Sequence, residues 1–155
     1  MLTAERINDA VEEYGDMLYR LCIVMLRNTA DAEDAVQETF ITYMEKSPAF
    51  NNSEHEKAWL LRVASNKCRN TLRYRKRHFA EPAEILDTII ERRPDNRILE
   101  SLMELPEKFR SVLHLHYIIG YKVDEIADIT GLTSSAVKMR LQKGRKLLAE
   151  EYRKE

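Results

Sequence analysis

Apolar residues recur at steps of three and four along almost the whole chain, which is the period of an amphipathic α-helix. The first helix is predicted from about Thr3 to Arg27, with Gly15 as a candidate break. A second should begin after Asp31, whose side chain suits an N-cap, and end near Pro48. A third covers about 56–77, and four more follow at about 96–105, 107–119, 123–130 and 134–150.

The chain as a whole is predicted to be all-α. Only four Gly and four Pro occur in 155 residues, which favours helices over a turn-rich β fold. Pro82 and Pro94 bracket a stretch of mixed charge that is typical of a linker. We therefore expect two small helical domains, residues 1–80 and 95–155, joined by a linker at 81–94.

Two further features concern the compartment. No apolar run approaches the roughly 20 residues that a membrane span needs, and the start of the chain does not resemble a signal peptide. A cytoplasmic protein without membrane insertion is expected. In that reducing compartment Cys22 and Cys68 should be small core residues rather than a disulfide.

Charge is divided into blocks along the chain. Residues 1–56 hold twelve acids and four bases, whereas residues 57–80 hold eight bases and no acid. Residues 108–155 are basic again, with ten bases and six acids. Basic blocks on a chain of net charge −1 indicate local binding sites for a polyanion.

The predicted second helix has one buried and one acidic face. Its apolar face should be core, and the opposite face carries a carboxylate-rich stripe with one isoleucine. That stripe is either an ordinary solvated face or a docking surface for a basic partner, with Ile41 at its apolar centre. Its residues are Asp34, Gln37, Glu38, Ile41 and Glu45.

The predicted third helix has a cationic face without a counter-acid, which is typical of a phosphate-binding surface. Asn66 and Asn70 can add hydrogen bonds to bases, and Tyr74 can stack on unpaired bases. Trp59 is either core or a second stacking residue. The polar loop at 48–56 lies just upstream, where it could close over a flipped base. The cations that share the face are Arg62, Arg69, Arg73 and Arg77.

The most specific local pattern is a helix-turn-helix at 123–141. Ala127 supplies the small residue between the helices, Gly131 the turn, and Val137 the apolar anchor. Thr133 or Ser134 can cap the second helix. The outward residues of that helix suit a DNA major groove. They are Ser135, Lys138, Met139, Gln142, Lys143 and Arg145.

Catalytic and metal sites are not indicated. His114 and His116 lie two apart and so point away from each other on a helix, and no phosphate loop or nucleophile motif occurs. No cofactor, catalytic residue or small-molecule substrate is therefore expected. Three other classes of protein share some of these features: a plain helix-turn-helix regulator, a nuclease and a protein-only interaction module. A plain regulator does not account for the acidic helix. A nuclease would need metal-binding carboxylates beside the basic helix, and residues 57–80 contain no acid. A protein-only module does not account for the two basic blocks.

Three segments together resemble the extracytoplasmic-function (ECF) group of bacterial sigma factors. Residues 31–40, DAEDAVQETF, are similar to the region 2.2 motif of that family. Residues 58–66, AWLLRVASN, and the basic run after them resemble regions 2.3 and 2.4. Residues 105–113, LPEKFRSVL, and the helix-turn-helix resemble region 4.

The resemblance implies a transcription initiation factor rather than an enzyme. It implies that core RNA polymerase binds Asp31, Asp34, Gln37, Glu38 and Ile41 through its β′ clamp helices, while its β flap is held by the second domain. It implies that the basic helix opens and reads the −10 element, with Asn66 near the captured base. Ser134–Lys146 would enter the major groove of the −35 element. An anti-sigma factor is implied as a further partner, which can hold the chain at the inner face of the membrane.

The recognition helix departs from the family pattern at two places. Members commonly have Gly-Thr before the anchoring valine and a small Ser two residues after it. This chain has Ser135-Ala136 and Met139 there. The family's base contacts at these positions therefore do not transfer to this chain.

Overall fold

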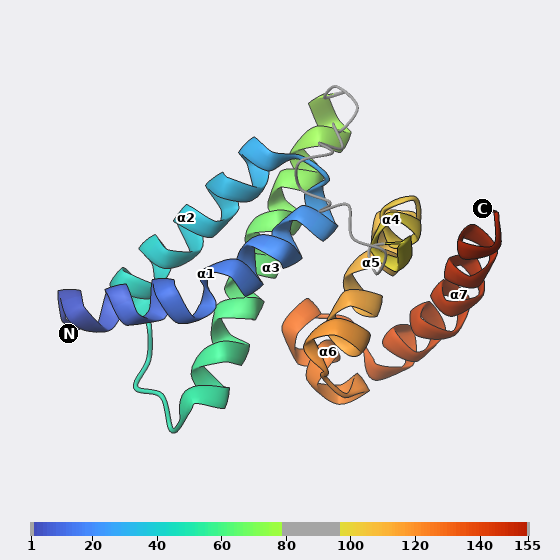
Figure 1. Ribbon diagram of the computed structural model, residues 1–155. Coiled ribbons are helices and arrows are strands. Elements are labelled where there is room, and N and C mark those ends of the chain that lie inside the picture. Colours follow the sequence, from blue (N-terminus) through green and yellow to red (C-terminus); the bar gives the residue numbers. More distant parts are fainter. Residues whose placement is uncertain (1, 79–96, 155) are drawn as a thin grey trace.

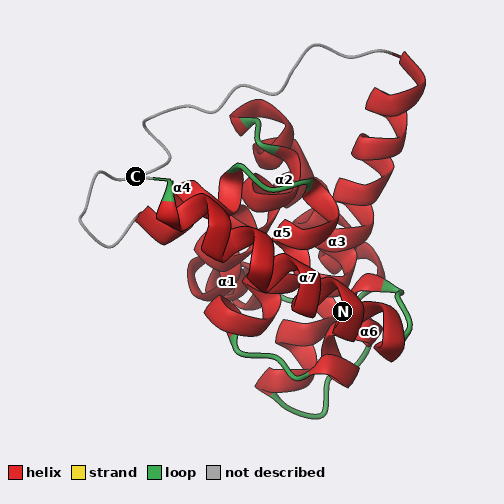
Figure 2. Ribbon diagram, turned by 90° about the vertical axis from the view of Figure 1, so that its right-hand side faces the viewer, coloured by secondary structure: helices red, strands yellow, loops and turns green. Residues whose placement is uncertain are grey.

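The computed structural model describes residues 2–78 and 97–154, and every regular element in these two stretches is a helix (Figures 1 and 2). The predicted all-α class is confirmed. The predicted linker at 81–94 lies outside the described residues.

The first unit consists of α1 (Ala4–Leu26), α2 (Thr29–Lys46) and α3 (Ser53–His78), each packed on the other two. Their apolar stripes meet in a core that includes Leu21, Tyr43 and Leu60, all fully buried. Cys22 and Cys68 are free and buried in this core, as expected.

Two details of the first unit differ from the prediction. Helix α1 continues through Gly15 without a break. Helix α2 begins earlier than expected because Asn28, and not Asp31, is its N-cap: the Asn28 side chain accepts a hydrogen bond of 2.9 Å from the main-chain N–H of Asp31. Both residue types are good caps, so residue type alone did not distinguish them.

The second unit consists of α4 (Arg97–Met103), α5 (Glu107–Leu113), the π-helix η2 (His114–Ile119), α6 (Val123–Thr130) and α7 (Ser134–Arg153). The predicted helix 107–119 is thus an α-helix that widens into a π-helix. Gly144 lies inside α7, where glycine costs about 1 kcal/mol relative to alanine. A Cβ at Gly144 would lie 3.0 Å from Leu113 Cδ1, so α5 and α7 approach each other closely at this glycine.

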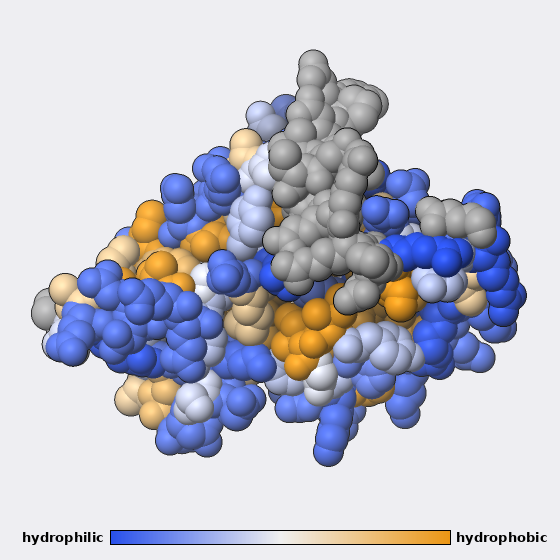
Figure 3. All heavy atoms as spheres, viewed as in Figure 1, coloured by the Kyte–Doolittle hydropathy of each residue, from blue (hydrophilic) through white to orange (hydrophobic). Residues whose placement is uncertain are grey.

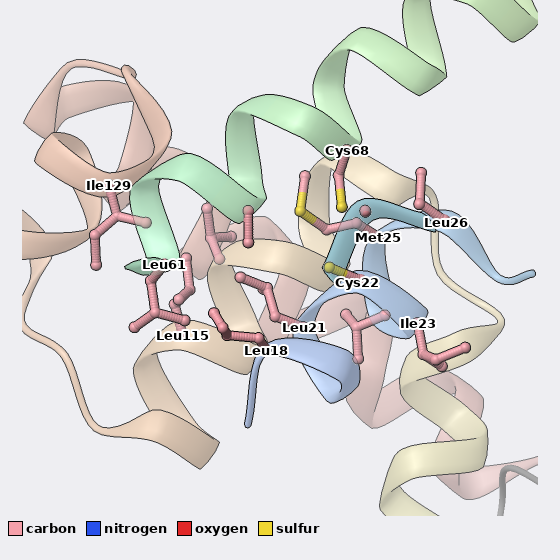
Figure 4. Packing of buried hydrophobic residues seen from close by; sticks show 14 of the residues in the cluster. Leu18, Leu21, Cys22, Ile23, Met25, Leu26, Leu61, Cys68, Leu115 and Ile129 are labelled. Atoms are coloured by element: carbon pink, nitrogen blue, oxygen red, sulfur yellow. The ribbon is translucent and has the colours of Figure 1, made fainter. Parts of the chain in front are cut away.

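The two units share one apolar core. Leu18 and Leu61 of the first unit and Leu115 and Ile129 of the second are almost completely buried, and they lie near one another in Figure 4. Helix α1 contacts α5 and η2, and α3 contacts α6. The two predicted domains are therefore packed on each other. The sequence predicted a linker between them but did not predict this contact.

A buried carboxylate ties the first unit together. Glu56, at the start of α3, is 2% exposed. It accepts hydrogen bonds from the Tyr43 hydroxyl of α2, at 2.6 Å, and from the Arg6 guanidinium of α1. Burial, with the hydrogen bond to Glu56 as the next cause, raises the pKa of Tyr43 to about 12. The hydroxyl thus stays protonated as a donor.

We predict that Glu56→Ala lowers the free energy of unfolding by about 1–3 kcal/mol, because the buried Tyr43 hydroxyl loses its acceptor. Arg6 is partly exposed and can be rehydrated, which limits the loss. Urea denaturation measures the effect. The control Glu45→Ala removes an exposed carboxylate of α2 and should change stability by less than about 0.5 kcal/mol. An equal loss in the two variants would contradict the role assigned to Glu56.

Candidate nucleic-acid and partner interfaces

The last turns of α3 project beyond the packed helices (Figures 1 and 2). Of the predicted residues on this helix, Trp59 and Arg69 are partly buried. The others are exposed: Arg62, Asn66, Asn70, Arg73, Tyr74 and Arg77. Six of the eight predicted side chains are therefore accessible to solvent.

Asparagines on this face orient the arginines one turn further on. Arg73 Nη1 donates to Asn70 Oδ1 at 2.9 Å, and Arg69 Nη2 donates to Asn66 Oδ1. Arg69 also donates to Ser65 Oγ at 2.7 Å. Burial, and then the nearby Arg73, lowers the pKa of Arg69. The face is thus a crowded row of cations, held in part by uncharged acceptors.

Trp59 belongs to an aromatic cluster at the start of α3. Its ring lies 6.2 Å from that of Tyr43 and 5.7 Å from that of Phe50, measured between centroids. Phe50 comes from the loop before α3 and was missed because the rest of that loop is polar. At the end of the loop, the Asn52 side chain accepts a hydrogen bond of 2.8 Å from the main-chain N–H of His55. In this structure Trp59 therefore packs against the first unit.

Tyr74 carries a second aromatic surface at the far end of α3. Its ring is 57% exposed and stacks on His78 with centroids 4.0 Å apart. His78 was not predicted, although its spacing of four residues from Tyr74 places both on one face of a helix. Both residues of the pair are exposed, as is Arg77, the neighbour of His78 in the sequence.

Arg75 uses its charge inside the protein. Its guanidinium donates to the main-chain oxygen of Leu26 at 2.7 Å and forms an ion pair with Asp31. Asp31, predicted to contact the polymerase, therefore joins α2 to α3. The charge pattern alone did not separate this arginine from its exposed neighbours.

The acidic stripe of α2 lies on the surface, as predicted. Asp34, Gln37 and Glu38 are exposed, and Ile41 is 47% exposed at its centre. Met44, three residues further on, has the same exposed fraction. It was missed because a lone methionine at the end of a helix resembles a core residue. The surface is thus a carboxylate stripe with a small apolar centre.

The helix-turn-helix is formed by α6, the turn at Gly131 and α7. Gly131 has a positive φ of 78°, as the pattern predicted. Thr133 caps α7, because its side chain accepts the main-chain N–H of Ala136 at 3.1 Å. Ser134, the other candidate cap, donates instead to Asp124 at 2.6 Å and so ties α7 to the start of α6.

The two faces of α7 divide as predicted. Val137 and Leu141 are buried, and Met139 is 71% exposed. Ser135, Lys138, Gln142 and Lys143 are exposed beside it. Arg145 is also exposed, but it already donates to the Tyr117 hydroxyl at 3.2 Å. In Figure 3, hydrophilic residues cover the outer part of this helix.

Residues 2–78 and 97–154 contain no group of three or more His, Cys, Asp and Glu side chains placed to hold a metal ion. Within the same stretches, no helix is both long and apolar enough to cross a membrane. The described residues present exposed acids on α1 and α2 and exposed bases on α3 and α7.

Comparisons with known proteins agree with this arrangement. Residues 10–78 match the family model of Sigma-70 region 2, and residues 95–148 match that of Sigma-70 region 4. The sigma factor RpoE of Bartonella quintana, co-crystallised with the anti-sigma factor NepR, has a TM-score of 0.79 at 22% identity, covering 97% of this chain and 98% of that one. CnrH, solved in complex with the cytosolic domain of CnrY, has a TM-score of 0.68 at 25% identity, covering 96% and 88%.

Relatives are found over nearly the full length. The ECF RNA polymerase sigma factor SigW of Bacillus subtilis (strain 168) is 29% identical over 164 residues, covering 94% of this chain and 88% of that protein. The RNA polymerase sigma factor SigV of the same organism is 27% identical over 149 residues, covering 94% and 90%. The two Sigma-70 family models together match most of the chain, and its full-length relatives include an ECF sigma factor. The chain therefore belongs to the ECF sigma factors, the initiation factors that bring bacterial RNA polymerase to promoter DNA.

Proposed function

We propose that three exposed helix faces divide the work of this sigma factor. The acidic face of α2 binds the β′ clamp helices of core polymerase. The face of α3 opens and reads the −10 element, and α7 reads the −35 element. The observation that carries this assignment is the sorting of charge: α2 presents acids, whereas α3 and α7 present cations, each opposite a buried stripe.

Helix α3 is suited to an opened strand rather than to a duplex alone. Arg62, Arg73 and Arg77 are exposed, and we assign them to backbone phosphates. The exposed ring of Tyr74 offers a stacking surface, and such stacking contributes about 1–3 kcal/mol per base. Unstacking a base costs a few kcal/mol, so stacking and phosphate contacts together offset strand opening. Trp59 contributes by holding the loop before α3 at the edge of this face.

Helix α7 is suited to the major groove. Lys138 and Gln142 are long enough to reach base edges, and Met139 offers apolar contact to a thymine methyl. Lys143, Arg145 and the N-terminal Ser134 and Ser135 are assigned to the backbone and groove wall. The exposed Tyr117 and Ile118 of η2 give the second unit an apolar surface for the β flap.

The chain supplies binding energy, and nucleotide chemistry stays with the polymerase. It acts in the cytoplasm, where the polymerase and promoters are. Both RpoE and CnrH were solved with partner proteins, and the partner of RpoE is an anti-sigma factor. We propose that this chain, too, is held inactive by such a partner. Run-off transcription by core polymerase, with and without this chain, on the promoter upstream of its own gene tests the function directly.

The acidic face yields the first prediction of binding. Asp34→Lys with Glu38→Lys should weaken core-polymerase binding by about 2–4 kcal/mol, the size of a hot-spot loss, because repulsion replaces attraction. Thermal stability should stay nearly unchanged, since both side chains are exposed. A titration with core polymerase measures this. Glu12→Lys with Glu13→Lys makes the same charge change on the exposed side of α1 and should bind normally. Equal affinity of the two double variants would reject the assignment.

The basic face yields a prediction on strand opening. Asn66→Ala should impair transcription from a duplex promoter more than from one with a pre-melted −10 region, because its contact forms with an extruded base. Arg73→Ala should instead lower the salt slope of promoter binding by about one unit, as the loss of one phosphate contact does. If Asn66→Ala impairs both templates alike, the side chain only positions Arg69.

The recognition helix yields a prediction on specificity. Lys138→Ala or Gln142→Ala should cost about 1–3 kcal/mol on the best promoter and flatten the preference at one base position each. Lys143→Ala should weaken binding to all sequences alike, as phosphate contacts do. Binding selection from randomised −35 elements measures both effects. A shifted consensus with Lys143→Ala, together with an unchanged one for the other two variants, would mean that α7 is rotated differently in the groove.

A further inference from the structure

We propose that Asn70 and Tyr117 are positioning residues for DNA binding, each offering an uncharged oxygen that holds a phosphate-binding arginine in place without neutralising its charge. Asn70 positions Arg73 on α3, and Tyr117 positions Arg145 on α7. This inference rests on the phosphate-binding roles proposed above for the two arginines. It differs from the sequence-based expectation that Asn70 bonds to a base.

Arginines that join helices of the first unit are paired with carboxylates. Arg6 of α1 forms an ion pair with Glu56 of α3, and Arg75 of α3 forms one with Asp31 of α2. Each carboxylate offsets the charge of its arginine. Neither guanidinium therefore keeps its full attraction for a phosphate.

The exposed Arg73 and Arg145 contact uncharged oxygens instead. Arg73 Nη1 donates to Asn70 Oδ1, about one turn earlier in α3, at 2.9 Å. Arg145 Nη1 donates to the hydroxyl of Tyr117 at 3.2 Å, and this bond joins α7 to η2. A guanidinium carries several N–H donors, so a bond to one neutral oxygen leaves other donors and the whole charge for a phosphate.

The two acceptors are themselves held in place. The Tyr117 ring meets the His116 ring edge to face, with centroids 4.7 Å apart. His116 Nδ1 lies 2.8 Å from the main-chain oxygen of Tyr121, and it must be the donor because a carbonyl only accepts. Asn70 lies within α3, three residues before Arg73, and residues at this spacing are neighbours on a helix surface. Each acceptor is thus tied to ordered backbone.

An uncharged acceptor suits an arginine that has to bind a phosphate. A long side chain loses rotamer freedom when it is ordered at an interface, and a bond that orders it beforehand reduces this loss. A carboxylate would also order the arginine, but it would offset the charge that displaces counterions from DNA. The Asn70 amide and the Tyr117 hydroxyl also carry donors of their own, which the same phosphate can accept.

The hydroxyl and the ring of Tyr117 have separate roles. The surface assigned to the β flap uses the ring, which lies in a side chain as exposed as that of Ile118, at 54%. The positioning of Arg145 uses the hydroxyl. Replacing Tyr117 by phenylalanine therefore removes the second role and leaves the first.

The test measures the salt dependence of promoter binding by the full chain in complex with core polymerase, on the promoter upstream of its own gene. Asn70→Ala and Tyr117→Phe remove the acceptor but keep the arginine. Each should weaken binding about two- to fivefold with an unchanged salt slope, because order is lost and charge is not. Asn70→Asp and Tyr117→Glu supply a charged acceptor. Each should lower the salt slope by up to about one unit, as the loss of one phosphate contact does.

Double variants show whether each acceptor acts through its arginine. In the background of Arg73→Ala, the substitutions of Asn70 should lose most of their effect, because the group that they position is gone. The substitutions of Tyr117 should lose theirs in the background of Arg145→Ala. Additive effects in both pairs would overturn the positioning roles, and so would single variants that match the parent in affinity and slope.

Two controls make the same chemical changes elsewhere. Asn8→Asp adds an acid to the exposed side of α1, and Tyr152→Phe removes a hydroxyl near the end of α7. Neither should change affinity or slope. Every substituted side chain is exposed, so circular dichroism should match that of the parent.

The single arginine variants test the underlying function separately. Arg73→Ala and Arg145→Ala should each lower the salt slope by about one unit. An unchanged slope in both would overturn the phosphate roles themselves, and the positioning roles with them. A lowered slope together with additive double variants would overturn the positioning roles alone.

Discussion

The C-terminus of α1 is the point on which the rest of the structure depends. Its final carbonyl groups are buried between the other helices and have no donor within α1. Arg75 of α3 donates a hydrogen bond to the main-chain oxygen of Leu26, and Arg110 of α5 donates to those of Val24 and Met25. Because an unsatisfied buried carbonyl costs about 1–3 kcal/mol, these bonds fix where α3 and α5 lie on α1. Apolar packing alone would tolerate small rotations of these helices, but directional hydrogen bonds tolerate them less.

This arrangement divides the arginines of the chain into two kinds. Arg75 and Arg110 are directed inward, to carbonyl and carboxylate oxygens, and hold the helices together. Arg73 and Arg77 extend from the projecting end of α3, where phosphates can reach them. Both kinds occur in the basic segments of the sequence, so a charge count overestimates the cations available to DNA. The difference lies in whether a helix end or an acid is within reach of each guanidinium.

Local features were predictable from the sequence, whereas long-range polar contacts were not. The helical period identified the buried and exposed faces of α2, and residue type predicted the turn at Gly131, because both depend on neighbours in the chain. Arg110 and Glu56 were missed, since each bonds to a residue far away in the sequence, 86 and 50 positions respectively. The hydrophobic pattern says which face of a helix is buried but not what covers it. For the same reason it did not predict that Leu61 would pack near Leu115 of the other unit.

A shared core between two DNA-binding units has a consequence for selectivity. Any ligand that needs the units apart must offset the junction contacts, and its apparent affinity falls by the fraction of open chains. Nonspecific DNA that must reach the covered part of α3 has to offset this cost with the contacts of one unit alone. In the function proposed above, core polymerase and a promoter together engage α2, α3 and α7, so the cost of separating the two units once is offset by several contacts. The junction therefore disfavours single contacts more than combined ones, and this favours the complete initiation complex over its parts.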